Sequence, residues 1–261
     1  LLIMKDIAGL INEKEDSVFF EQLSEKVKAS VNEVLLDRNK GIYVDGEGSS
    51  HSSLHANMLP LSVGLVPLEF KQNVVDFIKS RGMACSVYGA QYLLEGLFKA
   101  GEASYAYSLL TATHDRSWWN MIRSGSTISM EAWDMKYKPN SDWNHAWGAV
   151  PANIIPRYLW GIQPVKPGFA EARIQPYMDN LTNSEIKFPT IRGPIQAKYN
   201  LKSGNNHIYE LRIPGNMIAD FIIPTDKWGD LQVQVNGKRI VLTENSIPLK
   251  PGWNTIEFQM E

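Results

Sequence analysis

Apolar residues recur at helical spacing over the first 161 residues of the chain. In residues 17–36, five apolar side chains fall about four positions apart and would share one helix face: Phe20, Leu23, Val27, Val31 and Leu35. The same period predicts helices over residues 52–65, 69–80, 87–101 and 102–112, with Gly101 as a C-cap between the last two. Residues 144–161 also have helical spacing, but Pro151 and Pro156 predict a kink or two short helices there, with Pro151 in a first turn.

The pattern changes to short strands after residue 162. Runs bounded by Pro, Gly, Asn or Asp, several of them alternating, predict strands within residues 171–177, 184–190, 195–201, 208–214, 219–225, 231–242 and 254–260. Asn236-Gly237 is the strongest hairpin signal in the chain. Helices followed by strands, without alternation, predict an α+β protein with a helical domain over residues 1–161 and an antiparallel β-sandwich over residues 162–261.

Composition limits the possible partners. The 261 residues carry a net charge of −2, which gives no electrostatic basis for binding nucleic acid or an anionic membrane. No run of 18 apolar residues exists, so we expect no membrane-spanning helix. The single Cys85 excludes an internal disulfide and leaves the compartment open. The chain does not begin with Met and lacks a secretory signal pattern, so we expect a mature form or a fragment of something longer.

Motifs for cofactors, metals and nucleophiles are weak. "GEGSS" at residues 46–50 lacks the Lys-Ser/Thr pair of a phosphate-binding loop. His51 and His55 lie four positions apart without a third ligand in reach, which disfavours a metal site. Cys85 has no histidine nearby in sequence and fits a small buried residue. We therefore expect neither cofactor nor metal.

Aromatic and polar residues cluster between residues 118 and 147, which hold five of the eight tryptophans. Glu131 lies there, and a glutamate in such surroundings either pairs with a cation or stands in a cleft where its charge is used. Sugars present apolar faces that stack on Trp and hydroxyls that need Asp, Glu, His or Asn. Glycoside hydrolysis needs two carboxyl groups on either side of the bond, and Asp134 is too near Glu131 in sequence to be the second.

Several longer segments point to one family. They are "SVYGAQYLLEGLFKAGEASYAYSLL" (86–110), "TISMEAWD" (127–134), "WNHAWGAVPANIIPRYLWGIQP" (143–164), "PGFAEARIQP" (167–176), and parts of 188–200 and 211–224. Residues 45–223 thereby resemble the C-terminal portion of bacterial α-L-rhamnosidases, glycoside hydrolase family 78. The resemblance implies the later helices of an (α/α)6 toroid, followed by a C-terminal β-sandwich.

The resemblance also implies roles for individual residues. It places the general base, which activates water and inverts the anomeric carbon, on Glu131, and a sugar-contacting histidine on His145. Trp133 would form an aromatic wall. Trp143 and Asp134 complete the expected substrate-binding set, although Asp134 also suits a structural role in loop or helix-end hydrogen bonding.

Part of the family's pattern is missing. The general acid of such enzymes lies in an earlier segment with no counterpart here, and Asp142-Trp143 resembles it only superficially and in the wrong order. A toroid of twelve helices also needs more chain than residues 1–161 provide. We therefore expect a C-terminal fragment of a rhamnosidase, inactive alone. Its apolar face would be covered by the missing N-terminal part or by self-association.

Two other functions fit the same residues. A non-catalytic carbohydrate-binding module would keep the tryptophan wall without the acid, and another (α/α)6 hydrolase acting on glucosides would have similar Trp and Glu content. The resemblance leaves cytoplasmic, periplasmic and secreted locations open.

Overall fold

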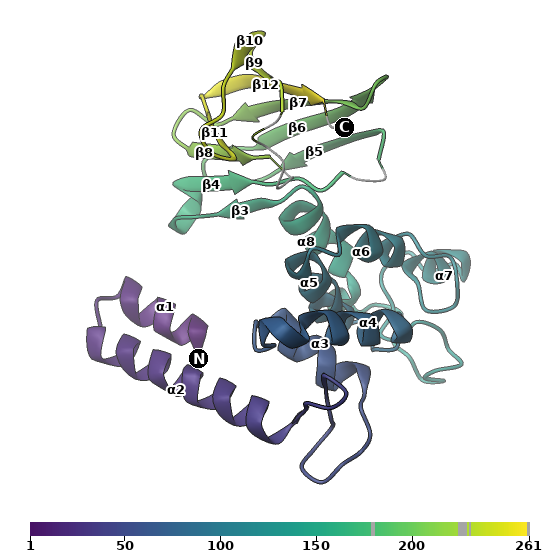
Figure 1. Ribbon diagram of the computed structural model, residues 1–261. Coiled ribbons are helices and arrows are strands. Elements are labelled where there is room, and N and C mark those ends of the chain that lie inside the picture. Colours follow the sequence, from purple (N-terminus) through teal and green to yellow (C-terminus); the bar gives the residue numbers. More distant parts are fainter. Residues whose placement is uncertain (179–180, 224–228, 230, 260–261) are drawn as a thin grey trace. The chain divides into compact units, whose positions relative to one another are not determined.

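The structure is a computed structural model that describes residues 1–178, 181–223, 229 and 231–259 (Figure 1). The chain divides into two compact units. Unit 1 comprises Leu1–Tyr105 and Thr111–Gly148, and unit 2 comprises Ala106–Leu110 and Ala149–Glu261.

Helices make up most of the chain before residue 149. They are α1 (Leu2–Leu10), α2 (Lys14–Val34), α3 (Leu54–Ser62), α4 (Lys71–Arg81), α5 (Ala90–Ala100), α6 (Ala103–Leu110) and α7 (Trp118–Arg123). Two 3-10 turns, η1 (Leu68–Phe70) and η2 (Ala146–Gly148), and a small hairpin of β1 (Leu36–Asp37) and β2 (Ile42–Tyr43) accompany them. The five helices predicted from periodicity correspond to α2 to α6, whereas α1 and α7 were not predicted.

Side-chain and glycine caps set several helix ends. Ser53 and Ser117 begin α3 and α7, and each hydroxyl accepts the backbone N–H three residues on, at 3.1 Å. Gly101 ends α5 with a left-handed φ of 89°, which confirms the predicted C-cap. The cap at Ser117 is a sequence signal that periodicity alone does not register, because α7 has only six residues.

The core of unit 1 lies between α3, α4 and α5, which pack against one another. Val74, Ile78, Leu93, Leu94 and Leu97 are at most 1% exposed. Burying such aliphatic side chains stabilises the folded state by about 1.5–3 kcal/mol each. These helices therefore form the rigid part of unit 1.

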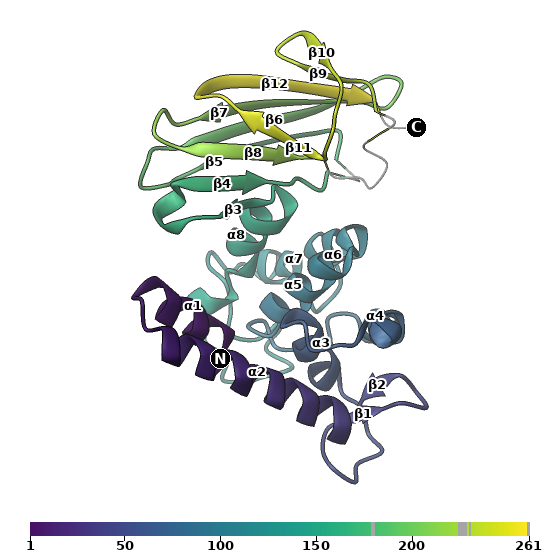
Figure 2. The same cartoon turned by 60° about the vertical axis from the view of Figure 1, so that its left-hand side comes forward.

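The α1–α2 hairpin (Figure 2) is different, because many of its apolar side chains are exposed. No residue of α2 is buried, and the predicted face from Phe20 to Leu35 is half-buried or exposed. In α1, Ile3, Ile7 and Leu10 recur along one side and are 73%, 51% and 64% exposed. An apolar helix face of this extent is typical of a surface that contacts another polypeptide.

Unit 2 begins with a broken helix. α8 (Val150–Ile154) has Pro151 in its first turn, and a π-helical turn, η3 (Ile155–Leu159), follows it with Pro156 near its start. The predicted kink or pair of short helices is confirmed. Gly161 then turns the chain into the first strand with φ of 63°, where an added Cβ would lie 1.9 Å from the Gln175 carbonyl oxygen. Only glycine fits that position.

Two sheets form the rest of unit 2 (Figure 1). The larger has the order β10 (Lys238–Ile240), β9 (Val233–Val235), β12 (Gly252–Gln259), β7 (Asn206–Ile213), β6 (Ile195–Lys202), β5 (Asn183–Phe188). The smaller has the order β11 (Ser246–Leu249), β8 (Ile218–Ile222), β4 (Glu171–Ile174), β3 (Ile162–Pro164), and a 3-10 turn, η4 (Pro167–Phe169), joins β3 to β4. Alternate residues of β6 and β7 are buried, as the two-residue period of a half-buried strand requires.

The two sheets share one core. Tyr209 in β7 and Phe221 in β8 contact each other across it, with ring centroids 5.0 Å apart, and both are at most 1% exposed. Burial raises the pKa of Tyr209 well above its ordinary value. The predicted fold class, a helical region followed by a β-sandwich, is confirmed.

The sandwich departs from the prediction in two details. β4 pairs with β8 in parallel, while every other strand pair among the described residues is antiparallel. β3 and β11 were not predicted, because each is only three or four residues long and contains a proline. Pro224, Thr225 and Met260, the last residues of two predicted strands, lie outside the described residues.

The predicted hairpin at Asn236-Gly237 is confirmed. It joins β9 to β10 as a two-residue turn, with φ of 52° at Asn236 and 74° at Gly237. Positive φ at both central residues is the backbone of a type I′ turn, which Asn-Gly favours.

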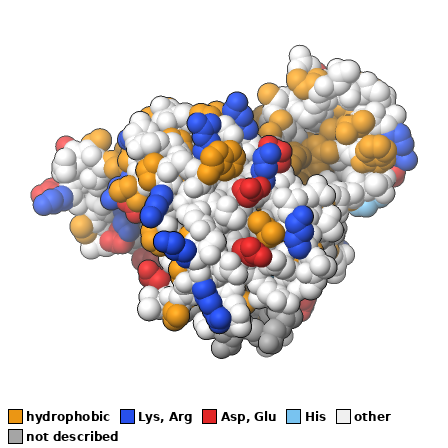
Figure 3. All heavy atoms as spheres, turned by 90° about the horizontal axis from the view of Figure 1, so that it is seen from above, with side chains coloured by type: hydrophobic (Ala, Val, Ile, Leu, Met, Phe, Trp, Pro, Cys, Tyr) orange, Lys and Arg blue, Asp and Glu red, His pale blue; other side chains and the backbone are white. Residues whose placement is uncertain are grey.

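Positively and negatively charged side chains are mixed on the surface that Figure 3 shows. Lys and Arg lie near Asp and Glu there, and hydrophobic side chains occur among them. This distribution suits the small net charge of −2. Within the described residues, no helix is both long and apolar enough to cross a membrane.

The exposed face of α1 predicts self-association of the isolated chain. We expect its sedimentation coefficient to rise with protein concentration, because pairing of the Ile3, Ile7 and Leu10 faces removes apolar surface from water. Ile7→Glu with Leu10→Glu should reduce this rise without changing the circular dichroism spectrum. Val241→Glu is the control, because Val241 is a single 91% exposed position of unit 2. It should leave the rise of the sedimentation coefficient with concentration unchanged. A monomer at every concentration would contradict the prediction.

Candidate functional site

The site is built on two irregular segments that backbone hydrogen bonds hold side by side. Glu131 donates its N–H to the Asp142 carbonyl at 2.8 Å, and His145 donates its N–H to the Ser129 carbonyl at 2.9 Å. The Ser129 hydroxyl donates back to the His145 carbonyl at 2.6 Å. Glu131 and His145 are thus fixed close together although they lie outside any helix or strand.

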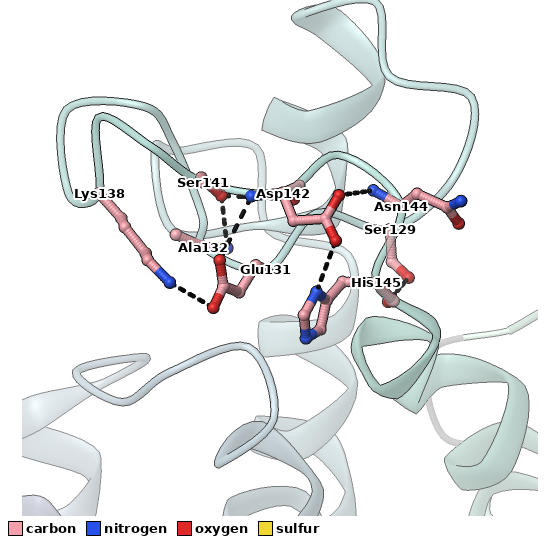
Figure 4. A network of polar contacts seen from close by, with 8 residues as sticks. All are labelled: Ser129, Glu131, Ala132, Lys138, Ser141, Asp142, Asn144 and His145. Carbon is pink, nitrogen blue, oxygen red and sulfur yellow. Dashed lines mark hydrogen bonds and ion pairs between the residues drawn. The ribbon is translucent and has the colours of Figure 1, made fainter.

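The carboxylate of Glu131 has two donors (Figure 4). Lys138 Nζ contacts Oε1, and the backbone N–H of Asp142 donates to Oε2 at 3.3 Å. The Lys138 hydrogen bond, followed by that from Asp142, lowers the pKa of Glu131 below its ordinary value. The side chain keeps 23% of its surface exposed, so it is paired with a cation and still open to solvent. Sequence reasoning offered these two situations as alternatives, and the structure combines them.

Glu131 lines a cavity of about 570 Å³, a size typical of small-ligand sites. All the residues that form this cavity belong to unit 1. They are His55, Ala84, Cys85, Ser86, Tyr88, Arg116, Glu131, Ala132, Trp133, Tyr137, Lys138 and Trp147.

Two exposed aromatic rings form one wall. The Tyr88 and Trp147 ring centroids lie 5.3 Å apart, and the side chains are 45% and 54% exposed. Trp147 also packs against the His145 ring at 4.3 Å. Open aromatic faces of this kind can stack on the apolar face of a sugar.

His145 lies beside the cavity rather than in its lining. Its Nδ1 contacts Asp142 Oδ2 at 3.3 Å, and 22% of its side chain is exposed. Figure 4 shows the imidazole and the Glu131 carboxylate on the same side of the loop. In the tautomer with its proton on Nδ1, the ring donates to Asp142 and leaves Nε2 as an acceptor.

Of the two tryptophans predicted to bind substrate, one lines the cavity and the other does not. Trp133 lines the cavity but is only 3% exposed, and its indole N–H donates to the Cys85 carbonyl at 2.7 Å. It packs edge-on against Trp118 and offers little open ring surface to a ligand. Trp143 is 40% exposed, donates to Met135 Sδ at 3.0 Å and does not line the cavity.

Asp134 makes local hydrogen bonds and does not line the cavity. It accepts the Lys136 backbone N–H at 3.0 Å and the Asn120 side-chain amide at 2.9 Å. The hydrogen bond from Lys136, then that from Asn120, lowers the pKa of Asp134. These contacts fit the structural role weighed for it.

Sequence reasoning missed most of the cavity lining, including Tyr88, Arg116, Tyr137, Lys138 and Trp147. Trp147 could have been found, because it follows His145 by two positions. Tyr88 and Arg116 come from distant segments and gave no local signal. His55 also reaches the cavity, whereas His51 pairs with Asp45 at 2.5 Å. Three or more His, Cys, Asp or Glu side chains suitably placed for a metal ion do not occur in the described part of the chain.

Comparison with known families assigns both halves of the chain. Residues 1–159 match the family described as bacterial alpha-L-rhamnosidase 6 hairpin glycosidase domain. Residues 161–238 match the bacterial alpha-L-rhamnosidase C-terminal domain. The helical region therefore belongs to a six-hairpin, (α/α)6 domain, in agreement with the predicted partial toroid. No curated protein sequence matches the chain.

Solved structures share the fold. The α-L-rhamnosidase from Dictyoglumus thermophilum superposes with a TM-score of 0.86 at 20% identity, over 99% of this chain and 30% of that one. The Streptomyces avermitilis α-L-rhamnosidase complexed with L-rhamnose gives 0.79 at 21% identity, over 97% and 25%. The enzyme from Aspergillus terreus gives 0.73 at 19%, over 94% and 28%. The chain thus spans 25–30% of the length of these proteins.

The Lys138–Glu131 ion pair gives a prediction about the pKa of Glu131. Lys138→Met removes the first cause of the lowered pKa, so we expect the pKa of Glu131 to rise toward its ordinary value. A ¹³C NMR titration of the Glu131 carboxyl carbon measures it. Lys136→Met is the matched control, because Lys136 pairs with Asp115 instead, and it should leave the Glu131 titration unchanged. An unshifted Glu131 pKa in Lys138→Met would show that the pair does not persist in solution.

Proposed function

The chain belongs to the bacterial α-L-rhamnosidases, glycoside hydrolase family 78, and from this premise we propose that it supplies the base-bearing part of an inverting rhamnosidase active site. The substrate would be a glycan or glycoside that ends in an α-L-rhamnosyl residue. The observation that supports this most directly is an ionised, solvent-open carboxylate, Glu131, in an aromatic-walled cavity.

Glu131 is suited to act as the general base. Its pKa is lowered, so it is a carboxylate at neutral pH and can accept a proton. A carboxylate has about four lone-pair positions, and Lys138 and Asp142 occupy one each. The remaining positions can hold a water molecule, which loses its proton to Glu131 as its oxygen attacks the anomeric carbon.

The sugar would sit against the aromatic wall. Tyr88 and Trp147 offer exposed rings for the apolar face of rhamnose. His145 lies beside the cavity in contact with Asp142, and with its proton on Nδ1 it could accept a hydrogen bond from a sugar hydroxyl through Nε2. We assign no direct sugar contact to Trp143, whose indole N–H donates to Met135, or to Asp134, whose carboxylate accepts from Lys136 and Asn120.

The general acid has to come from outside this part of the site. Among the described residues that line the cavity, Glu131 is the only carboxylate. An inverting pair stands about 6.5–9.5 Å apart on opposite sides of the sugar. Asp142 cannot be the partner, because its backbone pairs with that of Glu131 and its carboxylate contacts His145. We propose that preceding helices of a longer enzyme supply the acid and cover the α1 face.

A non-catalytic carbohydrate-binding role is the second possibility, and the single carboxylate of the cavity favours it. The two proposals differ in what Glu131 does. In a binding module it would only hold sugar hydroxyls, whereas in the hydrolase it also accepts a proton from water.

We expect the 261-residue chain to show no turnover of an aryl α-L-rhamnoside, because loss of the general acid forfeits a factor of about 10²–10⁴ in rate. Release of the chromogenic phenol measures it. Turnover that Glu131→Gln abolishes would contradict the fragment proposal and show that a complete acid–base pair is present.

Binding of L-rhamnose tests the cavity itself. We expect Trp147→Ala to weaken rhamnose binding severalfold, since it removes half of the exposed aromatic wall. Isothermal titration calorimetry or ligand-observed NMR measures it. Trp253→Ala is the matched control, because Trp253 in unit 2 is also 54% exposed and lies outside the cavity. Equal losses in the two variants, or none in either, would remove the cavity as the sugar site.

A further inference from the structure

Arg116 is the charged residue of the cavity that the proposed reaction does not use. It lies just before the Ser117 cap of α7, and its guanidinium stacks on the Tyr137 ring, with Cζ 4.8 Å from the ring centroid. The guanidinium makes one hydrogen bond, from Nη1 to the Met83 carbonyl at 3.5 Å, the outer limit for such a bond. Most of its five N–H donors are therefore uncommitted.

The other charges of the cavity cancel. Arg116, Glu131 and Lys138 are its charged Asp, Glu, Lys and Arg residues, and Lys138 is paired with Glu131. Within the described residues no carboxylate lies at ion-pairing distance from Arg116, and the adjacent Asp115 is paired with Lys136. The cavity thus holds one uncompensated positive charge although the whole chain is slightly acidic.

Arg192 shows how a guanidinium with a structural role is held in this protein. Arg192 donates to the Gly168 and Asn216 carbonyls at 2.9 and 2.8 Å, and each of these bonds is short enough to fix the side chain. Arg116 has no contact of that kind and instead presents its donors beside the cavity.

We propose that Arg116 forms a subsite for a carboxylate on the sugar to which the rhamnose is attached. This inference rests on the proposed function and narrows its substrate class to acidic glycans in which rhamnose is linked to a uronic acid. L-Rhamnose is a neutral deoxy sugar, so a carboxylate must belong to the neighbouring unit. A guanidinium held over the Tyr137 ring can pair with a carboxylate through two parallel N–H···O bonds.

The test compares two ligands that differ only in charge: an α-L-rhamnosyl-D-glucuronic acid disaccharide and its methyl ester. Isothermal titration calorimetry of the 261-residue chain gives both affinities, with L-rhamnose as the reference ligand. We expect the acid to bind the unmodified chain about tenfold or more tightly than the ester, the size expected of a charge-assisted hydrogen-bond pair.

Arg116→Gln should reduce this ratio to about one while leaving the affinity for the ester unchanged. Arg81→Gln is the matched control, because Arg81 also stacks on an aromatic ring at 4.8 Å, that of Phe77, but does not line the cavity. It should keep the ratio of the unmodified chain. If Arg116 has only a structural role, Arg116→Gln will instead weaken the binding of both ligands equally.

Each variant is judged on a ratio of two affinities, so partial loss of folded protein cancels. Should Arg116→Gln not fold, Arg116→Lys keeps the charge and removes the planar fork, and it should lower the ratio severalfold. Equal binding of acid and ester to the unmodified chain, or a ratio unchanged in the Arg116 variants, overturns the carboxylate subsite and leaves the rhamnose site standing. Absence of binding by rhamnose and by both disaccharides overturns the proposed function as well.

Discussion

The candidate site depends on the backbone hydrogen bonds that join residues 129–131 to residues 142–145. Neither segment lies in a helix or strand, so no ladder of repeated hydrogen bonds fixes them. The bonds from Glu131 to Asp142 and from His145 to Ser129 do this instead. Gly148 contributes, because an added Cβ would lie 2.8 Å from that of Ser129 and would displace the segment. Glu131 and His145 therefore share one rigid support.

That support also affects the charge of Glu131. The turn between the two segments returns Lys138 to Glu131, and this hydrogen bond lowers the pKa of the carboxylate. A lower pKa makes Glu131 a weaker proton acceptor, although a glutamate at its ordinary pKa is already unprotonated at neutral pH. The same pairing neutralises Lys138 within the cavity, so Arg116 remains as the group available to an anionic ligand.

The two units of the chain differ in how far their apolar side chains are covered. Unit 2 has a continuous core that includes residues of both sheets, and its strands bury alternate side chains. Unit 1 has a buried centre in α3 to α5 and an open face on α1 and α2. The cavity is lined entirely from unit 1, so the cavity and the uncovered apolar surface lie in the same unit.

The sequence by itself determined the order of helices and strands, the Asn236-Gly237 hairpin, the broken helix at Pro151 and Pro156, and the family. These follow from periodicity, turn chemistry and local motifs, which act over a few residues. Short elements such as α7, β3 and β11 were not predicted, since three to six residues do not define a period. Glu131 was predicted from the aromatic and polar residues near it in sequence and from the family resemblance, and His145 and Asp142, which are near it in sequence, are also near it in space.

Only the tertiary structure decided what surrounds that carboxylate. Trp133 was expected in the wall, yet its indole N–H is bound to the Cys85 carbonyl 48 positions earlier in the chain, which buries it. Tyr88 and Arg116 reach the cavity from segments far from Glu131 in sequence. Contacts over such separations arise from packing of the helices as a whole, and no pattern within a single segment encodes them.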